Sequence, residues 1–162
     1  MNRRIFLYGS AGALAVFGGA AAWRSNSPAR AGDFEITRSD AEWRAMLSQR
    51  QYAILREGAT ERAHTSALNA EERDGAYHCG GCDLALYSSA TKYDSGTGWP
   101  SFYAALPHAV GTRPDGVFRT QTEVHCRRCG GHLGHIFDDG PPPTGKRHCI
   151  NGLALMFRPA SA

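Results

Sequence analysis

The sequence lacks an apolar run long enough to cross a membrane. One soft stretch, residues 11–22, consists mainly of alanine and glycine, whereas a transmembrane helix needs about 20 consecutive apolar residues. The chain also lacks a linker, because no internal repeat divides it and "GPPPTG" (140–145) is its one low-complexity tract. We therefore expect a single domain that does not span a membrane.

An excess of positive charge is also missing once the N-terminus is set aside. Residues 1–31 contain four of the 18 lysines and arginines and none of the 15 acidic residues. Residues 32–162 keep 14 basic and 15 acidic groups, a formal charge of −1, although the full chain carries +3. A positive field is what attracts a nucleic-acid backbone. We therefore expect no nucleic-acid partner.

The first 31 residues have the pattern of an export signal. "RRIFL" (3–7) resembles the start of a twin-arginine signal, and the apolar stretch 11–22 follows it. "ARA" (29–31) is a small-x-small pattern after which signal peptidases cut. We expect a signal peptide over 1–31, export by the twin-arginine route to a periplasmic or similar location, and no stable membrane association of residues 32–162 after cleavage. An uncleaved anchor and an ordinary Sec signal are the alternatives.

The remaining chain predicts a mainly β domain with a short helical segment before it. Residues 37–57 predict a helix, because Ser39 and Glu42 form a capping box and apolar residues follow at helical spacing. A second short helix is expected within 65–75, and the acidic residues from Glu61 to Asp74 predict a solvated face. Beyond it, strand-sized runs alternate with glycine and proline. These runs are 76–79, 84–89, 101–106, 116–126 and 152–159, with a turn at "RPDGV" (113–117).

Four of the five cysteines form two C-x-x-C units, Cys79 with Cys82 and Cys126 with Cys129. A zinc knuckle requires the chain to turn back so that both sulfurs face one ion, and each unit has glycine that permits this turn. The pattern predicts one structural Zn²⁺ bound by four thiolates. Two alternatives stay open. Local disulfides would suit an oxidising compartment but constrain little chain. A redox dithiol at "CGGC" would need a helix after the motif, where "DLALYSS" alternates like a strand.

Cys149 has no partner in this arrangement. Lys146, Arg147 and His148 precede it, and positive charge favours the thiolate, which is the nucleophilic form. An unpaired thiol in an exported protein is a liability unless it is used. A buried core cysteine is the alternative. We expect a reactive cysteine.

Three longer strings resemble the B-type methionine sulfoxide reductases. They are "CGGCDLALY" (79–87), "TKYDSGTGWPSFY" (91–103) and "CRRCGGHLGHIFDDGPPPTGKRHCIN" (126–151), and the resemblance extends over about residues 34–158. It implies a fold of two small antiparallel sheets with the zinc far from the active site. It also implies thiol-dependent reduction of methionine R-sulfoxide in oxidised proteins or peptides. The reductant would be an external thiol or a thioredoxin-like protein.

The same resemblance implies the roles of four reacting or orienting residues. Cys149 would attack the sulfoxide sulfur and become a sulfenic acid. His132 and His135 would polarise and protonate the sulfoxide oxygen. Asn151 would orient these histidines and the water between them. The alternative for the two histidines is a structural role beside the zinc, because they follow Cys129 closely.

Three further residues would shape the substrate site by the same resemblance. Trp99 would pack against the S-methyl group of the substrate, which would help to select one epimer. Arg147 and Asp139 would set the local charge. The alternative for Trp99, which precedes a proline, is simple filling of the core.

The chain departs from many relatives at Thr97, where they carry a second, resolving cysteine. With four cysteines assigned to zinc and one to catalysis, none is left to form an internal disulfide. We therefore expect an external thiol to regenerate the enzyme. Two other functions stay open. A zinc-ribbon binding module would not need Cys149, and a thiol–disulfide oxidoreductase would use Cys79 and Cys82 without zinc.

Overall fold

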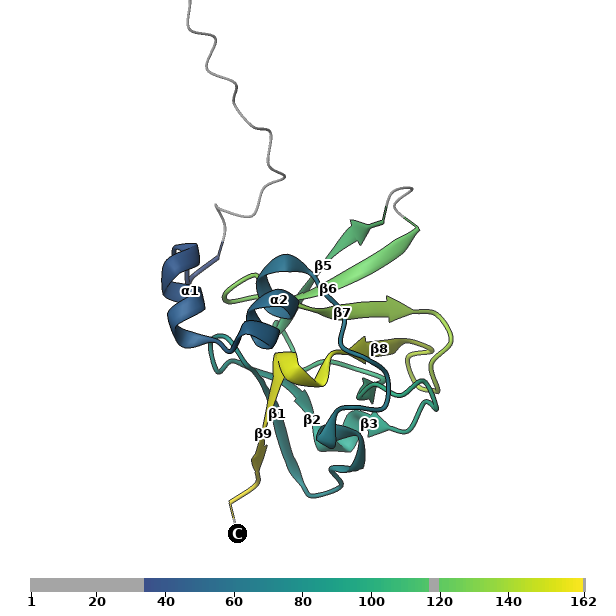
Figure 1. Ribbon diagram of the computed structural model, residues 1–162. Helices are drawn as coiled ribbons and strands as arrows, with labels where there is room; N and C mark the ends of the chain where they lie inside the picture. The colour runs from purple at the N-terminus through teal and green to yellow at the C-terminus, as the bar shows by residue number, and fades with distance from the viewer. Residues whose placement is uncertain (1–33, 117–119, 162) are drawn as a thin grey trace, which may run out of the picture.

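The computed structural model describes residues 34–116 and 120–161 (Figure 1). The predicted signal peptide and its cleavage point lie outside these residues. The described chain is mainly β, as expected, with nine strands in two antiparallel sheets. The strands are β1 (Gly75–Cys79), β2 (Ala85–Ser88), β3 (Lys92–Tyr93), β4 (Ser101–Phe102), β5 (Val110–Asp115), β6 (Gln121–Cys126), β7 (His132–Phe137), β8 (Arg147–Ile150) and β9 (Leu155–Pro159).

The two sheets differ in size and in what they carry. The smaller has the order β2-β1-β9, and the larger has the order β3-β4-β8-β7-β6-β5. An aromatic cluster joins them, because Tyr77 and Tyr87 of the small sheet contact Phe102 of the large one, with ring centroids 4.9 and 4.3 Å from it. All three side chains are fully buried. This packing makes the two sheets one hydrophobic core.

The helix expected over 37–57 is two helices, α1 (Asp40–Met46) and α2 (Gln49–Glu57). The expected capping box of Ser39 and Glu42 begins α1. A second capping box, Ser48 with Gln51, begins α2. Leu47 between them is extended, so the first helix ends there. In Figure 1 both helices lie on the same side of the molecule, and α2 packs against β7.

The second helix expected within 65–75 is also wrong in extent. Only a 3₁₀ turn forms, η1 (Ala67–Ala70), capped by the Ser66 hydroxyl, and β1 already begins at Gly75. Two further 3₁₀ turns are η2 (Ser89–Thr91) and η3 (Gly152–Ala154). No helix among the described residues is long and apolar enough to cross a membrane.

The expected strands are largely confirmed, with differences at their ends. Within the runs at 76–79, 84–89, 116–126 and 152–159 lie the central parts of β1, β2, β6 and β9. The run at 101–106 keeps only two strand residues, those of β4. The turn predicted at 113–117 is wrong over Arg113 to Asp115, which belong to β5. Strand β7, which carries both predicted catalytic histidines, was not expected.

Candidate functional site

The four paired cysteines converge on one point. Cys79 and Cys126 end strands β1 and β6, and Cys82 and Cys129 lie in the turns that follow. Their sulfurs all lie within 4.8 Å of one another, with 3.7 Å between Cys79 and Cys129 and 3.5 Å between Cys82 and Cys126. A tetrahedral ion with metal–sulfur bonds of about 2.3 Å separates its sulfurs by about 3.8 Å. The four cysteines are therefore clustered so as to hold a metal ion.

The backbone around this cluster shows why the second pair needs glycine. Gly130 has φ +68°, and a Cβ there would lie 2.3 Å from the Phe34 ring. The Gly81 amide donates to the Cys79 sulfur at 3.4 Å. The mutual hydrogen bonds of the four thiols raise the pKa of Cys79 and lower that of Cys82. A bound cation would remove this conflict, because all four sulfurs could then be thiolates.

The alternatives for these cysteines find less support. All five cysteines are free, so neither C-x-x-C unit closes a disulfide. The chain after Cys82 continues into strand β2 rather than into a helix. The dipole of a helix N-terminus, which lowers the first thiol's pKa in redox motifs, is therefore missing beside "CGGC".

Cys149 lies in the middle of the larger sheet, on β8 between β4 and β7. It is in register with Ser101 on one side and with His135 on the other. His135 in turn pairs with Glu123 of β6, and Glu123 pairs with Arg113 of β5. Residues in register on neighbouring strands point to the same face of a sheet. The register therefore places a thiol, an imidazole, a carboxylate and a guanidinium in one row.

A β-bulge brings the second histidine onto the same face. His132 and His135 are three residues apart, which would place them on opposite faces of a regular strand. The pairing of β6 with β7 shifts between Val124 and His125, and Leu133 is the extra residue. The bulge reverses the alternation, and the two imidazole rings lie 5.4 Å apart. The structure thus brings together the two histidines that the sequence predicted to act as a pair.

Close approach of β7 and β8 depends on Gly134. A Cβ built at this residue would lie 2.0 Å from the carbonyl oxygen of Cys149. That neighbour is backbone of the strand that carries the nucleophile, so it cannot rotate away. Only glycine at this position allows the two strands to pair where His135 and Cys149 face each other.

Each histidine is fixed by a carboxylate. Nδ1 of His132 lies 2.9 Å from Oε1 of Glu123, and Nε2 of His135 lies 2.9 Å from Oδ2 of Asp115. Glu123 also accepts two hydrogen bonds from the Arg113 guanidinium. Burial alone would raise the pKa of Glu123, but the bonds from His132 and Arg113 lower it to about 2. Glu123 is therefore ionised at neutral pH.

The sequence did not predict these partners of the two histidines. Arg113 and Asp115 fell in a predicted turn, and Glu123 belonged to a predicted strand without a role. No motif marks them, because they meet the histidines only through the register of three strands. The odd spacing of two histidines expected to act together was the one available signal of a bulge.

Cys149 itself is half-buried, and its Sγ lies 3.9 Å from Oγ1 of Thr97. Burial raises the pKa of the Cys149 thiol above its ordinary value, and the Thr97 hydroxyl and the Arg147 guanidinium offset only part of that. Arg147 is fixed by Asp139 through two bonds of 2.8 Å. The predicted neighbours Arg147 and Asp139 therefore form one ion pair beside the nucleophile.

The expectation that three basic residues together favour the thiolate is wrong. His148 points away from Cys149, with Nδ1 3.2 Å from the Tyr87 hydroxyl, and burial lowers its pKa to about 4, so it is neutral. Lys146 pairs with Asp138. Only Arg147 acts on the thiol, because neighbouring residues on a strand face opposite sides.

Asn151 and Trp99 bind backbone groups next to the site. Asn151 is 3% exposed, and its side-chain amide donates to the carbonyl of Leu133, the bulge residue, at 3.0 Å. Its Oδ1 accepts from the amide of Glu61 at 2.9 Å. The Trp99 indole N–H donates to the carbonyl of Glu61 at 3.1 Å. Asn151 thus reaches the histidines through the bulge backbone, and Glu61, expected on a solvated face, is buried.

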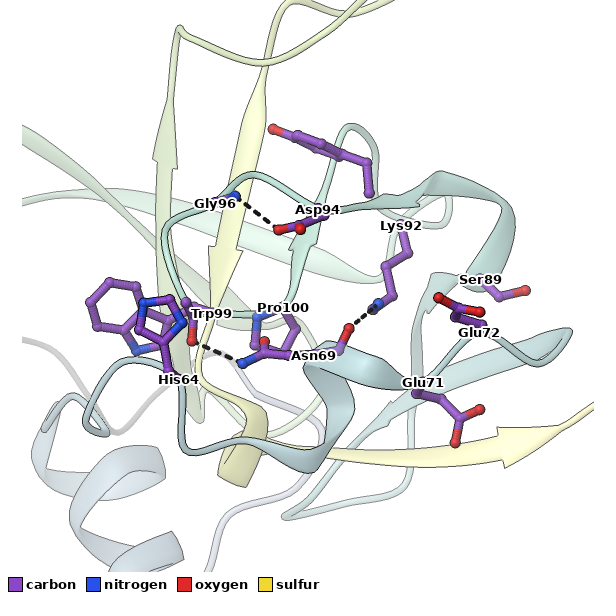
Figure 2. Close-up of a pocket in the computed structure, with 12 residues that line it drawn as sticks. His64, Asn69, Glu71, Glu72, Ser89, Lys92, Asp94, Gly96, Trp99 and Pro100 are labelled. Atoms are coloured by element: carbon purple, nitrogen blue, oxygen red, sulfur yellow. Dashed lines mark hydrogen bonds between the residues drawn. The ribbon is translucent and has the colours of Figure 1, made fainter.

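A cavity of about 520 Å³ opens beside the loop of residues 94–100, which we call the Trp99 loop. Figure 2 shows His64 next to Trp99, and Asn69 between the Trp99 loop and Lys92. The Asn69 side chain donates to the Gly98 carbonyl at 3.0 Å, and Lys92 donates to the Asn69 carbonyl at 2.9 Å. The loop that carries Thr97 and Trp99 is therefore supported by Asn69, which Lys92 contacts in turn.

Comparison with known proteins gives a family match over most of the chain. The model of the SelR domain matches residues 47–159. A protein of Pseudomonas putida (strain W619), described as peptide methionine sulfoxide reductase MsrB, is 50% identical over 127 residues, 77% of this chain and 96% of its own length. Proteins of the same description from Thiobacillus denitrificans and Agrobacterium fabrum are 53% and 47% identical, over 75% and 77% of this chain and 94% of each relative.

Proposed function

We propose a one-cysteine mechanism for this chain, which belongs to the SelR domain family and reduces methionine sulfoxide in proteins. The observation that carries the proposal is the row across the large sheet, where Cys149 faces His135 in register and lies beside Thr97. Relatives that share about half of its residues are described as peptide methionine sulfoxide reductases. The family membership supports the reaction, and the row of side chains supports the proposed roles of Cys149 and His135.

In the first step the sulfur of Cys149 attacks the sulfoxide sulfur while the oxygen gains a proton. A bond forms between the two sulfurs, the protonated oxygen then passes from the substrate sulfur to the Cys149 sulfur as the sulfenic acid, and the thioether of methionine leaves with the electron pair of the broken sulfur–sulfur bond. Burial raises the pKa of Cys149. The thiol must therefore lose its proton during the reaction to become the nucleophilic thiolate. Arg147 stabilises the resulting thiolate.

His132 and His135 supply the acid. Glu123 stays ionised and binds Nδ1 of His132, so Nε2 is the ring atom left to exchange a proton with the oxygen. That atom is buried and has no hydrogen-bond partner among the described residues. A proton donor facing the reacting oxygen is what general acid catalysis requires.

Recycling needs a second thiol from outside. A thiol attacks the sulfenic sulfur and forms a mixed disulfide with release of water, and a further thiol then restores Cys149 and leaves as a disulfide. Thr97 occupies the place next to Cys149, and its hydroxyl cannot form a disulfide. An external thiol or a thioredoxin-like protein would therefore serve as reductant.

Trp99 is the apolar surface for the S-methyl group, and this contact would select the R epimer. The indole is fixed by its bond to the Glu61 carbonyl, so its position relative to Cys149 is set before substrate binds. Asn151 keeps the bulge in place and acts on the histidines through it. Fixing the methyl group and the oxygen while Cys149 approaches the sulfur from one side distinguishes two substrates of opposite configuration at sulfur.

The metal proposed for the four cysteines is one structural Zn²⁺. The residues fit it, because four thiolates at tetrahedral separations and without an open position form a closed structural site. The ion would join the turns after β1 and β6, which belong to different sheets. Its contribution would be to folding.

We also propose that residues 1–31 are a twin-arginine signal and that residues 32–162 act outside the cytoplasm. The support is the sequence pattern alone. Twin-arginine export carries folded proteins, which would allow the metal to be bound before export. The two other functions considered, a binding module and a dithiol oxidoreductase, find no separate support.

Turnover of the two separated methionine sulfoxide epimers with dithiothreitol tests this proposal. The wild-type chain is expected to reduce the R epimer, and Cys149→Ser is expected to lose turnover completely while it keeps its fold. Cys149→Ser has no nucleophile but retains the strand pairing, so circular dichroism should not change. Turnover of the serine variant at the wild-type rate would remove Cys149 from the mechanism.

A further inference from the structure

A buried carboxylate contacts the segment that follows the catalytic strand. Glu61 lies in the loop between α2 and η1 and is only 6% exposed. Its carboxylate accepts hydrogen bonds from the backbone amides of Gly152 and Leu153, the latter at 3.2 Å. These amides begin η3, directly after β8 and Asn151. Buried amides need partners, and here one side chain supplies both.

The backbone of the same residue contacts two parts of the active site. The Glu61 amide donates to Oδ1 of Asn151 at 2.9 Å, and the Glu61 carbonyl accepts from the indole of Trp99 at 3.1 Å. Asn151 in turn binds the carbonyl of Leu133, the bulge residue that turns His132 toward Cys149. Glu61 is therefore bonded to the residue that fixes the acid and to the residue that faces the methyl group.

The surrounding packing leaves this residue little freedom. A Cβ at Gly152 would lie 1.8 Å from Oγ of Ser66 and 3.2 Å from Oε1 of Glu61. The segment after Glu61 also binds the Trp99 loop, because the His64 amide donates to the Gly98 carbonyl at 2.8 Å. The Glu61 carboxylate thus anchors one end of a segment that also contacts the Trp99 loop.

We propose that Glu61 is a positioning residue that fixes Trp99 relative to the His132 bulge. This inference rests on the proposed roles of Trp99 and His132. Glu61 would act through these residues and would not touch the substrate. A sulfoxide offers its methyl group, its oxygen and its sulfur in fixed relative directions. Selecting one epimer requires the three receiving groups to keep their separation. Glu61 is bonded both to Trp99 and to Asn151, which binds the bulge.

Steady-state kinetics of Glu61→Ala and Glu61→Gln with each epimer test this role. In Glu61→Ala the KM for the R epimer should rise about tenfold and the preference over the S epimer should fall, because small displacements at a reacting centre are costly. Glu61→Gln keeps one acceptor oxygen and should show a smaller change. The matched control is Glu57→Ala, which removes an exposed carboxylate on α2.

Loss of stability alone would give a different result. A smaller folded fraction lowers the apparent kcat per total protein but leaves KM and the epimer preference unchanged, and that outcome would overturn the proposal. If Glu61→Ala does not fold, the same comparison is made with Glu61→Gln. A second readout is hydrogen exchange of the indole N–H of Trp99 by NMR. It should become faster in both variants, while that of Trp43, buried in α1, should not.

A Trp99→Ala variant separates this inference from its premise. An unchanged KM in Trp99→Ala would remove Trp99 from the substrate site, and with it both the proposed methyl contact and the role of Glu61. A raised KM in Trp99→Ala together with an unchanged KM in both Glu61 variants would overturn the role of Glu61 alone.

Discussion

At the scale of the residue, the site places a thiol of raised pKa beside groups whose positions are fixed. Arg147 is bonded to Asp139, His132 to Glu123 and His135 to Asp115. Each of these pairs keeps a side chain in one orientation before substrate arrives. Catalysis then depends on geometry that is present in the free enzyme, which lowers the reorganisation needed in the transition state.

Thr97 gives a direct test of the one-cysteine mechanism. Its hydroxyl is 3.9 Å from the Cys149 sulfur, and Gly96 beside it, at φ +70°, has open space around it. Thr97→Cys should therefore form a disulfide with Cys149 after one turnover, since a bond of about 2.04 Å needs only a small closure of the loop. Mass spectrometry without reductant measures this, and turnover with a thioredoxin-type donor should rise.

The control for this prediction is Thr97→Ser, which keeps the hydroxyl and adds no thiol. Like the wild type, it should retain a sulfenic acid that a trapping reagent can label. A disulfide between Cys149 and any of the four clustered cysteines during wild-type turnover would contradict the mechanism.

The lowered pKa of Glu123 predicts how the free energy of unfolding depends on pH. Its pKa is lowered from an ordinary 4.5 to about 2 in the folded chain, so the unfolded chain binds its proton first as pH falls. The stabilisation is complete above pH 4.5 and is lost as pH falls toward 2. Its upper bound is about 3 kcal/mol, at 1.36 kcal/mol per pKa unit. Denaturant unfolding at pH 7, 4 and 3 measures it.

Glu123→Gln should be less stable than wild type at pH 7, and the difference should shrink between pH 4.5 and 2. Glu57→Gln, an exposed carboxylate, is the control and should follow the wild-type curve. A Glu123→Gln difference that stays constant over this pH range would show that the carboxylate contributes through shape rather than charge.

At the scale of the element, strands with an alternating pattern or a C-x-x-C unit were predictable, whereas β5 and β7, which carry Asp115 and the two histidines, were not. The C-x-x-C pairs and the alternating runs indicated β1, β2, β6 and β9. Strand β5 contains Pro114, and proline is typical of turns. The sheet tolerates this proline because β5 is an edge strand. The break between α1 and α2 was hidden because Ser48 lies within a continuous helical pattern.

The site residues divide in the same way. Cys149, His132, His135, Trp99, Arg147 and Asp139 all lie in the strings that carry the family resemblance, and the structure places them around one strand. Glu123, Asp115 and Glu61 were missed because their contacts depend on strand register and on a long loop. A one-residue bulge changes which face a side chain occupies, and hydrophobic periodicity does not reveal such a bulge.

Substitution of one of the four paired cysteines should lower both the metal content and the stability of the protein. Cys126→Ser removes one of four thiolates, and a three-sulfur site should lose most of its bound zinc. Because binding of structural zinc contributes directly to folding, the melting temperature should fall by about 10 °C or more. Thermal melting with metal analysis of the purified protein measures both, and Cys149→Ser is the matched control with full zinc content. A Cys126→Ser variant that melts like wild type would exclude the structural metal.

At the scale of the whole molecule, the cysteine cluster and the row of predicted catalytic groups have different places in the fold. The four-cysteine cluster lies where β1 of the small sheet and β6 of the large one end, while the row crosses the middle of the large sheet. The aromatic cluster of Tyr77, Tyr87 and Phe102 lies between the sheets. The predicted catalytic groups on neighbouring strands keep their separation because the core holds the two sheets together, and a metal bound by the four cysteines would add a second link.

The proposed export of this domain can be tested with arginine substitutions. Replacing Arg3 and Arg4 together by lysine preserves charge but should block the twin-arginine route, because that route recognises the arginine pair itself. The expected result is a precursor that accumulates inside the cell, folded and with its metal bound, measured by fractionation and immunoblotting. The matched control replaces Arg24 and Arg30, which lie outside "RRIFL", by lysine and should be exported as the parent is. Equal export of the Arg3 and Arg4 variant would point to a Sec signal, and the chain would then have to fold and bind its metal after crossing the membrane.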